Sequence, residues 1–306
     1  MLVTGSSGFV GQHLLRRLDP SARVLGVDLV PAPSSHGHRC ELGDVRDRRR
    51  IAELTGALPA GTVVHLAAVA EVVIPFAGHA ELMSINFDGT LGVLEAAEPR
   101  HLVLASTSSA YGDAPPGTSS EPQTVPAPLG IYAASKVAAE MACRAWARER
   151  GGRAVALRLG NVIGAGCRGL IPFLVRHARR HPDGAVPAVL RGGGALLRDY
   201  VPVEHVVDVV LAAADRCAGA GELTVLNVGT GVARSNRFVA EAVVAALAER
   251  GLRLAVEFTA PPEPGEATRT AMDVSATRRL LGVTLPDEAA VLASIDSAVA
   301  AELAGQ

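Results

Sequence analysis

Apolar and polar residues alternate along the chain with two different periods. Six short apolar runs predict buried strands, at residues 1–4, 23–27, 62–66, 101–105, 154–159 and 223–228. Elsewhere apolar residues recur every three or four positions and predict helices, at residues 12–18, 48–56, 79–97, 132–150, 170–180, 204–217, 235–250, 275–281 and 287–303. Ser235 is expected to cap the helix that begins there. Because strands and helices alternate, we expect an α/β fold with a doubly wound parallel sheet.

Glycines follow the first predicted strand in the segment Gly5-Ser-Ser-Gly8-Phe-Val-Gly11, and a predicted helix follows them directly. Glycines allow a tight turn and a close approach to a pyrophosphate, which a helix N-terminus attracts. Asp28 ends the second predicted strand, about 20 residues further on, where a carboxylate can bind both ribose hydroxyls. That carboxylate would repel the 2′-phosphate of NADP, so the segment predicts binding of NAD.

Four hydroxyl residues, Ser106 to Ser109, lie at the carboxyl end of the fourth predicted strand, the edge of a parallel sheet where ligands bind. Tyr132 and Lys136 are four residues apart and therefore share one face of a predicted helix. The Lys136 ammonium would lower the pKa of the Tyr132 phenol, which makes Tyr132 a candidate base. The same spacing also occurs in ordinary amphipathic helices. His65 is interpreted as a packed structural histidine.

Composition and charge exclude several classes of protein. The chain has 306 residues, of which 49% are hydrophobic, and a formal net charge of -2, so it is not a disordered chain. No stripe of Lys and Arg is interleaved with aromatic residues, so we expect no nucleic-acid partner. No apolar stretch is long enough to span a bilayer and no signal peptide is recognised, so we expect no membrane partner. Four scattered cysteines favour a reducing, cytoplasmic location.

Two segments predict irregular structure. His36, His38 and Cys40 lie close together in the sequence, but no second pair of ligands accompanies them. We interpret them as part of a solvated loop and expect no metal. Residues 113–130 are rich in Pro, Ser and Gly and predict a long loop beside the active site.

The motifs, in their order along the chain, resemble those of the extended short-chain dehydrogenase/reductase family, the NAD-dependent nucleotide-sugar epimerases and dehydratases. The resemblance covers nearly the whole chain. It implies that the catalytic residues are Thr107, Tyr132 and Lys136. It implies cofactor binding by Gly5, Gly8, Phe9, Val10, Gly11, Asp28, Asp44, Val45, Leu66, Ala67, Ala68, Asn86, Ala105, Tyr132, Lys136 and Val162. It implies substrate binding by Thr107, Ser108, Tyr132, Asn161 and Arg198.

The resemblance also implies two domains. A Rossmann-type NAD-binding domain would comprise residues 1–160 and 199–228, and a smaller mixed α/β substrate-binding domain would comprise residues 161–198 and 229–306. The chain departs from the family at two places. Glu263 stands where members often carry a diphosphate-binding arginine, for which Arg269 is a candidate substitute, and Gly169 stands where some carry an asparagine.

The resemblance implies that Tyr132 removes a proton from a sugar hydroxyl while NAD accepts a hydride from the same carbon. Family dehydratases carry acidic residues directly after the catalytic threonine, where this chain has Ser108 and Ser109. We therefore expect epimerisation of a nucleotide-diphosphate sugar, with a UDP-sugar and the C4 position favoured. The alternatives are an NAD(P)H-dependent nucleotide-sugar 4-ketoreductase and a non-catalytic dinucleotide-sensing protein. We also expect a homodimer that pairs the helices at 79–97 and 131–149.

Overall fold

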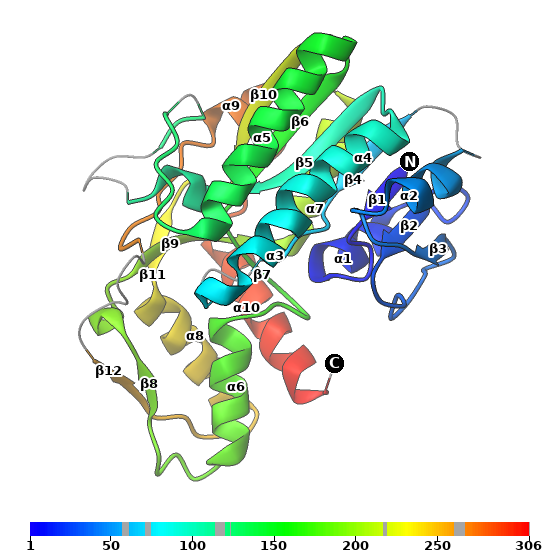
Figure 1. Ribbon diagram of the computed structural model, residues 1–306. Coiled ribbons are helices and arrows are strands. Elements are labelled where there is room, and N and C mark those ends of the chain that lie inside the picture. The colour runs from blue at the N-terminus through cyan, green and yellow to red at the C-terminus, as the bar shows by residue number, and fades with distance from the viewer. Residues whose placement is uncertain are drawn as a thin grey trace.

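Seven parallel strands form the main sheet of the molecule (Figure 1). The structure is a computed structural model and describes residues 1–56, 61–70, 75–113, 120–122, 124–216, 219–259 and 267–305. The strand order is β10-β6-β5-β4-β1-β2-β3, and every neighbouring pair is parallel. In chain order the strands are β1 (Leu2–Thr4), β2 (Leu25–Asp28), β3 (Arg39–Leu42), β4 (Thr62–His65), β5 (His101–Thr107), β6 (Arg153–Leu159) and β10 (Glu222–Val228). The six strands that the sequence predicts are confirmed.

Side chains alternate along each strand, so the sheet presents apolar residues on both faces. In β5, Leu102 and Leu104 pack on one face and Val103 packs on the other. The helices that cover the two faces are α1 (Phe9–Arg17), α2 (Arg48–Thr55), α4 (Gly89–Ala97), α5 (Ile131–Arg150) and α7 (Val203–Asp215). Helices α1 and α7 contact each other, and α4 contacts both α2 and α5 (Figure 1). This arrangement confirms the Rossmann-type, doubly wound fold.

Helix α5 runs from the carboxyl edge of the sheet to its amino edge, because it follows β5 and precedes β6. It ends where Gly151 takes the left-handed conformation, with φ of 67°. Tyr132 and Lys136 belong to its first turns and therefore lie near the carboxyl edge, where ligands of parallel sheets bind.

The predicted helix at 79–97 is continuous but not regular. It consists of α3 (His79–Met83), one π-helical turn labelled η2 (Ser84–Asp88), and α4. Single π turns inside α-helices occur frequently at functional sites. Here the turn contains Asn86, whose side chain is fully buried.

A smaller part of the molecule lies below the main sheet in Figure 1. Its helices pack around one apolar cluster and are α6 (Leu170–Arg180), α8 (Asn236–Glu249) and α10 (Glu288–Leu303). Its strands form a mixed sheet of β7 (Asn161–Ile163), β9 (Leu197–Pro202) and β11 (Ala233–Ser235), and a pair of β8 (Ala188–Leu190) and β12 (Val256–Phe258). The Ser235 hydroxyl accepts the Phe238 N–H at 3.1 Å, so the predicted cap of α8 is confirmed.

The last two predicted helices are also present, as α9 (Ser275–Leu281) and α10. Helix α9 contacts β10 and α7 of the main sheet, although it falls in the range that the sequence assigns to the smaller domain. The predicted domain division stays a prediction.

Candidate active site

Two glycines of the loop after β1, Gly5 and Gly11, leave no room for a side chain. Gly5 has φ of 72°, and a Cβ there would lie 2.6 Å from the backbone nitrogen of Ala67. A Cβ on Gly11 would lie 2.2 Å from the carbonyl oxygen of Gly5. Gly8 is exposed, and its nearest neighbour would be 3.3 Å from a Cβ. No side chain caps the N-terminus of α1 at Gly8, so its N–H groups and helix dipole can serve an anion.

The Asp28 carboxylate lies beside this loop at the end of β2. Its Oδ2 accepts the Ser7 N–H at 2.9 Å, and its Oδ1 accepts the Val30 N–H at 3.3 Å. These two bonds hold the carboxylate at the carboxyl edge of the sheet, close to the uncapped N-terminus of α1. A pyrophosphate site and a ribose-binding carboxylate side by side fit a dinucleotide cofactor.

Asp44 and Val45 follow β3 and line the next part of this edge. Hydrogen bonds from Arg46 lower the pKa of the Asp44 carboxyl. Val45 is buried, and a Cβ on Gly89 would lie 2.6 Å from its side chain. Val45 therefore fixes the distance between this loop and α4, while Asp44 keeps its negative charge.

His65, at the end of β4, joins the first strand to the π turn. It is fully buried, its Nδ1 lies 2.6 Å from the Thr4 hydroxyl, and its Nε2 lies 3.2 Å from the Thr90 hydroxyl. Thr90 gives its only proton to the Asn86 carbonyl, so it must accept from Nε2–H, and Nδ1 must accept from Thr4. Burial lowers the pKa of His65 to about 3, which keeps the ring neutral. The interpretation as a structural histidine is confirmed.

Asn86 continues this network to the catalytic helix. Its side chain bonds both backbone groups of Val69, accepting the N–H at 2.8 Å and donating to the carbonyl at 3.0 Å. Its remaining N–H donates to the Ser135 hydroxyl at 2.9 Å, and Ser135 donates to the Tyr132 carbonyl at 2.7 Å. The segment after β4, the π turn and the first turn of α5 are thus held together around the predicted nicotinamide site.

Thr107 and Tyr132 meet at the carboxyl end of β5. The Thr107 hydroxyl accepts the Ser109 N–H at 3.1 Å, which leaves its own proton for Tyr132. Burial raises the pKa of Tyr132, and the hydrogen bond with Thr107 acts in the opposite direction. The predicted lowering of the pKa of Tyr132 is wrong for the protein without its cofactor, because the effect of burial dominates.

Lys136 is buried one helical turn after Tyr132, with 2% of its surface exposed. Burial lowers its pKa to about 8, against the effect of Glu140 and Cys143. The sequence prediction overlooked Glu140, which is fully buried and forms a two-pronged ion pair with Arg158. The sequence pattern that could have revealed Glu140 is a carboxylate four residues after Lys136, on the helix face that packs against the sheet.

The predicted substrate residues come from different elements. Ser108 is buried in the short helix η3 (Ser108–Tyr111) that follows β5, whereas Asn161 is exposed at the start of β7. Arg198, on β9, donates to the carbonyls of Leu197 and Ala267 at 2.9 and 2.6 Å. Its role toward a phosphate stays a prediction. Glu263 lies outside the described residues.

The motifs around Arg198 and after β10 meet through one buried carboxylate. Asp199 accepts the N–H groups of Thr230 and Gly231, and the Thr230 hydroxyl, each at 2.8 Å. This contact fixes β9, which carries Arg198, against the loop after β10.

The segment at residues 36–40 is more ordered than predicted. His38 is buried, with its Nε2 3.1 Å from the carbonyl of Leu15, and Cys40 lies in β3. The interpretation of these two residues as part of a solvated loop is therefore wrong. Within the described ranges, no group of three His, Cys, Asp or Glu residues could hold a metal ion, and no helix has the length and apolar character of a membrane span.

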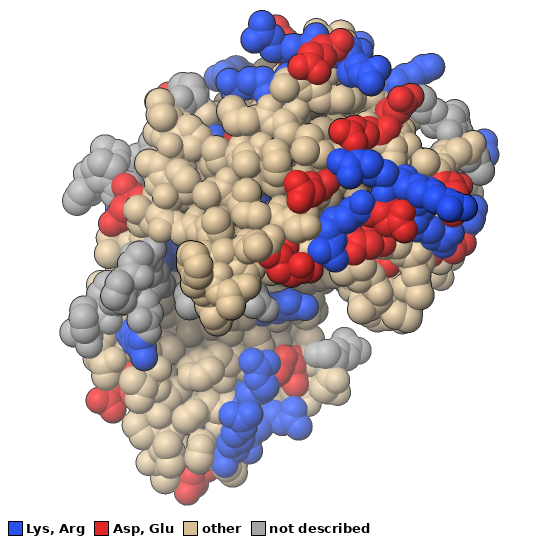
Figure 2. Space-filling model, viewed as in Figure 1, with Lys and Arg blue, Asp and Glu red and all other residues tan. Residues whose placement is uncertain are grey.

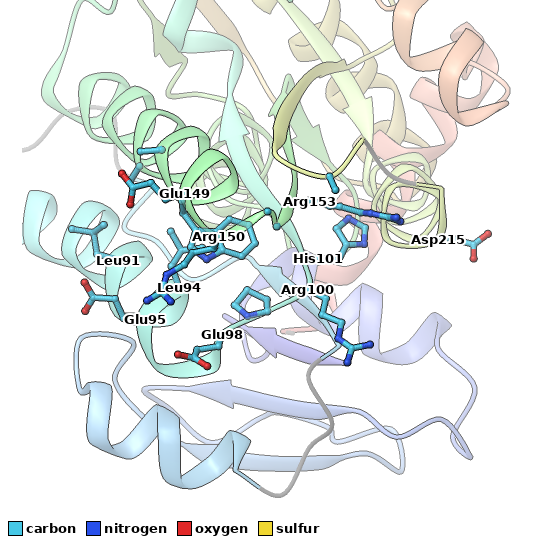
Figure 3. Close-up of a pocket in the computed structure, with 17 residues that line it drawn as sticks. Leu91, Leu94, Glu95, Glu98, Arg100, His101, Glu149, Arg150, Arg153 and Asp215 are labelled. Atoms are coloured by element: carbon cyan, nitrogen blue, oxygen red, sulfur yellow. The ribbon is translucent and has the colours of Figure 1, made fainter.

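A cavity of about 910 Å³ lies at the opposite edge of the sheet (Figure 3). Glu98 and Arg150 from the ends of α4 and α5 line it, together with His101 and Arg153 from the starts of β5 and β6. Eighteen residues of α5 separate Arg150 from Tyr132, a distance of about 27 Å along the helix. The cavity is therefore not part of the candidate active site.

Comparison with known proteins also indicates a dinucleotide-binding enzyme. The sequence model of the NAD dependent epimerase/dehydratase family matches residues 1–229. A UDP-glucose 4-epimerase of Mycolicibacterium smegmatis is 31% identical over 308 residues, 92% of either protein. The dTDP-6-deoxy-L-talose 4-dehydrogenase (NAD(P)(+)) of Kitasatospora kifunensis is 33% identical over 307 residues, 92% of this chain and 89% of that protein.

Among solved structures, MoeE5 in complex with UDP-glucuronic acid and NAD matches with a TM-score of 0.84 and 30% identity. The match covers 100% of this chain and 99% of that chain. The glycine loop, Asp28 and the Thr107–Tyr132 pair occupy the edge where this fold binds its dinucleotide. The chain belongs to the NAD dependent epimerase/dehydratase family, within the extended short-chain dehydrogenases/reductases, and NAD is its cofactor.

Proposed function

We propose that the protein inverts the configuration at C4 of a UDP-linked sugar through a transient 4-keto intermediate. One observation carries the proposal: the Thr107 hydroxyl bonds the Tyr132 phenol at the carboxyl edge of the sheet, with Lys136 buried one turn further along α5. A hydroxyl, a phenol and an ammonium in this order form a route for one proton to and from a sugar hydroxyl.

In the proposed mechanism Tyr132 removes the proton of the C4 hydroxyl, and Thr107 orients that hydroxyl. NAD⁺ supplies the hydride acceptor and a positive ring that favours the Tyr132 phenolate. Lys136 holds the cofactor ribose, and the positive ring together with the Thr107 hydrogen bond opposes the rise in the pKa of Tyr132 that burial causes. Asn86 and Ser135 hold the backbone of Tyr132 through hydrogen bonds. The phenol is therefore already positioned before the substrate binds.

The residues after Thr107 favour epimerisation over dehydration. Elimination of water needs an acid beside the leaving hydroxyl, and Ser108 and Ser109 carry no proton that they can give at neutral pH. The simplest fate of the keto-sugar is then rotation in the site and return of the hydride to the opposite face.

The substrate class follows from the relatives and from the position of the basic residues. MoeE5 has been solved with UDP-glucuronic acid and also with UDP-glucose, each together with NAD. We propose that Arg198 contributes to the diphosphate site, and that Arg269 replaces the arginine missing at Glu263. This proposal is supported by the backbone β-bridge between Arg269 and Leu197, the residue before Arg198.

The test is incubation of the purified protein with catalytic NAD and either UDP-glucose or UDP-glucuronic acid. Inversion at C4 without net consumption of cofactor supports the proposal, and the faster substrate identifies the sugar. The 4-dehydrogenase relative makes a 4-ketoreductase the second candidate. Stoichiometric oxidation of NADH or NADPH by a 4-keto-sugar, without inversion, would identify that activity instead. Tight NAD binding without any turnover would identify a dinucleotide-sensing protein.

We further propose a cytoplasmic homodimer that pairs α5 and the α3–α4 helix across a two-fold axis. Figure 2 shows a broad uncharged area over α5, whereas Lys, Arg, Asp and Glu gather over α2. Met141 of α5 is 41% exposed and would be covered by the partner subunit in this dimer. Cys40, Cys143 and Cys167 are free thiols, as is usual in a reducing compartment.

A further inference from the structure

Both oxygens of the Glu140 carboxylate accept hydrogen bonds from groups other than Lys136. Its Oε2 accepts Arg158 Nη2 at 2.7 Å, and its Oε1 accepts Arg158 Nε at 3.0 Å. The Ser106 hydroxyl donates to the same Oε1. Glu140 is fully buried and Arg158 is 2% exposed, so water does not compete for these bonds. Ser106 directly precedes Thr107, which joins the pair to the catalytic strand.

Lys136 lies one helical turn before Glu140, on the same face of α5. It is 2% exposed, yet among the residues that the structure describes its ammonium makes no hydrogen bond or ion pair. The groups that act on it are His65 from β4 and, from later turns of α5, Glu140 and Cys143. His65 and Cys143 are neutral, since burial lowers the pKa of His65 and raises that of Cys143.

Arg158 is held in place from three sides. Its guanidinium lies over the ring of Tyr111, with the central carbon 4.6 Å from the ring centroid. Its Nη1 donates to the carbonyl of Pro122 at 3.3 Å. The planar guanidinium therefore presents a fixed pair of donors to Glu140, a geometry that a lysine cannot reproduce.

We propose that Arg158 is a positioning residue that acts through Glu140 on Lys136. By holding both carboxylate oxygens against its guanidinium, it keeps Glu140 from forming an ion pair with Lys136 and leaves the Lys136 ammonium available to the cofactor. The inference rests on the proposed function, since the cofactor role of Lys136 is part of that proposal. Without the guanidinium, Glu140 would be a buried carboxylate beside a buried ammonium, and the two would pair.

The experiment measures NAD affinity by equilibrium dialysis. Circular dichroism and thermal melting check that each variant is folded, and only folded variants are compared. Arg158→Met is expected to weaken NAD binding by about 10-fold, the effect of losing one charged contact. The double variant Glu140→Gln with Arg158→Met removes both charges and is expected to bind NAD within about 3-fold of the unmodified protein. In a Lys136→Met background, Arg158→Met is expected to change the NAD affinity no further, because Lys136 is the group through which Arg158 acts.

A purely structural ion pair gives a different result. Folded Arg158→Met protein would then bind NAD with unchanged affinity, or its defect would persist in the Lys136→Met background, and either outcome overturns the proposal. If Arg158→Met does not fold, Arg158→Lys is measured in the same two backgrounds, with a smaller loss expected only where Lys136 is present. NAD affinity is read without any sugar. Failure of the unmodified protein to invert C4 would therefore reject the proposed reaction while leaving this result intact.

Discussion

At the scale of single residues, two glycines of the loop after β1 have different neighbours and so different roles. Gly11 is packed against the backbone of Gly5, where a Cβ would lie 2.2 Å from a carbonyl oxygen. Gly8 is exposed at the start of α1, and a Cβ there would lie 3.3 Å from the carbonyl oxygen of Gly5, a much looser contact. The first glycine maintains the fold of the loop, and the second leaves room for the cofactor to approach the helix N-terminus.

Gly11→Ala is expected to reduce the free energy of unfolding by about 1–3 kcal/mol, the usual effect of overpacking against a rigid neighbour. Gly8→Ala is expected to leave the melting temperature almost unchanged and to weaken NAD binding by about 10-fold. Thermal melting and NAD titration of both variants check the pair. Equal losses of stability in the two variants would contradict this separation of roles.

Lys136 gives a second prediction at this scale, through its pKa. Because burial lowers that pKa to about 8, the ammonium is charged below pH 8 and is lost as the pH rises above it. NAD affinity is expected to be constant from about pH 6 to 7.5 and then to fall by up to about 10-fold for each further pH unit. In Lys136→Met the affinity should be weaker and independent of pH. A decline above pH 8 that persists in Lys136→Met would assign it to another group.

At the scale of elements, the π turn within the α3–α4 helix determines where Asn86 points. Its side chain satisfies the backbone of Val69 and the hydroxyl of Ser135, and through Ser135 it bonds the carbonyl of Tyr132. One π-helical turn therefore connects the segment after β4 to the beginning of α5.

Asn86→Leu keeps the volume of the side chain but leaves the Val69 groups and Ser135 without a partner. Each buried polar group left unsatisfied costs about 1–3 kcal/mol, so a marked loss of stability and of kcat is expected. Ser84→Ala is the matched control, since within the described ranges the Ser84 side chain makes no hydrogen bond in the same turn. The free energy of unfolding in denaturant and the initial rate are measured for both variants. If Ser84→Ala loses as much stability and activity as Asn86→Leu, the role of the Asn86 amide is refuted.

Some helices and strands could be predicted from the sequence, and others could not. The six central strands were predictable because each is an apolar run bounded by turns. Strand β3 was not, because its four residues Arg39 to Leu42 form an edge strand with no buried side chain. The pairing of Glu140 with Arg158 was equally invisible, because the two charges come from different elements and meet only after α5 packs on β6. The turn geometry of Asn86 depends on a π turn that periodicity does not encode.

At the scale of the whole molecule, the carboxyl edge of the main sheet brings together four groups: the glycine loop, Asp28, Thr107 and Tyr132. The first and last of these are more than a hundred residues apart in the sequence. The opposite edge holds the cavity of Figure 3, far along α5. The uncharged area over α5 (Figure 2) is part of the proposed subunit interface.

The proposed dimer is tested by placing a charge on that face. Met141→Glu is expected to convert the protein to a monomer, because a desolvated carboxylate without a partner opposes association. Leu292→Glu on α10 is the matched control, since Leu292 is also 41% exposed but lies outside the proposed interface. Sedimentation velocity at micromolar concentration distinguishes the two. An unmodified protein that sediments as a monomer, or a dimer that survives Met141→Glu, would reject this interface.

The central claim is that the hydride taken from C4 returns to C4 of the same sugar. It is tested most directly with a UDP-sugar carrying deuterium at C4, incubated with the protein and catalytic NAD and followed by NMR. The account predicts that the C4 epimer forms with its deuterium retained and without net formation of NADH, and that Tyr132→Phe binds NAD but forms no epimer. Loss of the deuterium to the cofactor pool, an unchanged sugar, or normal turnover by Tyr132→Phe would contradict it.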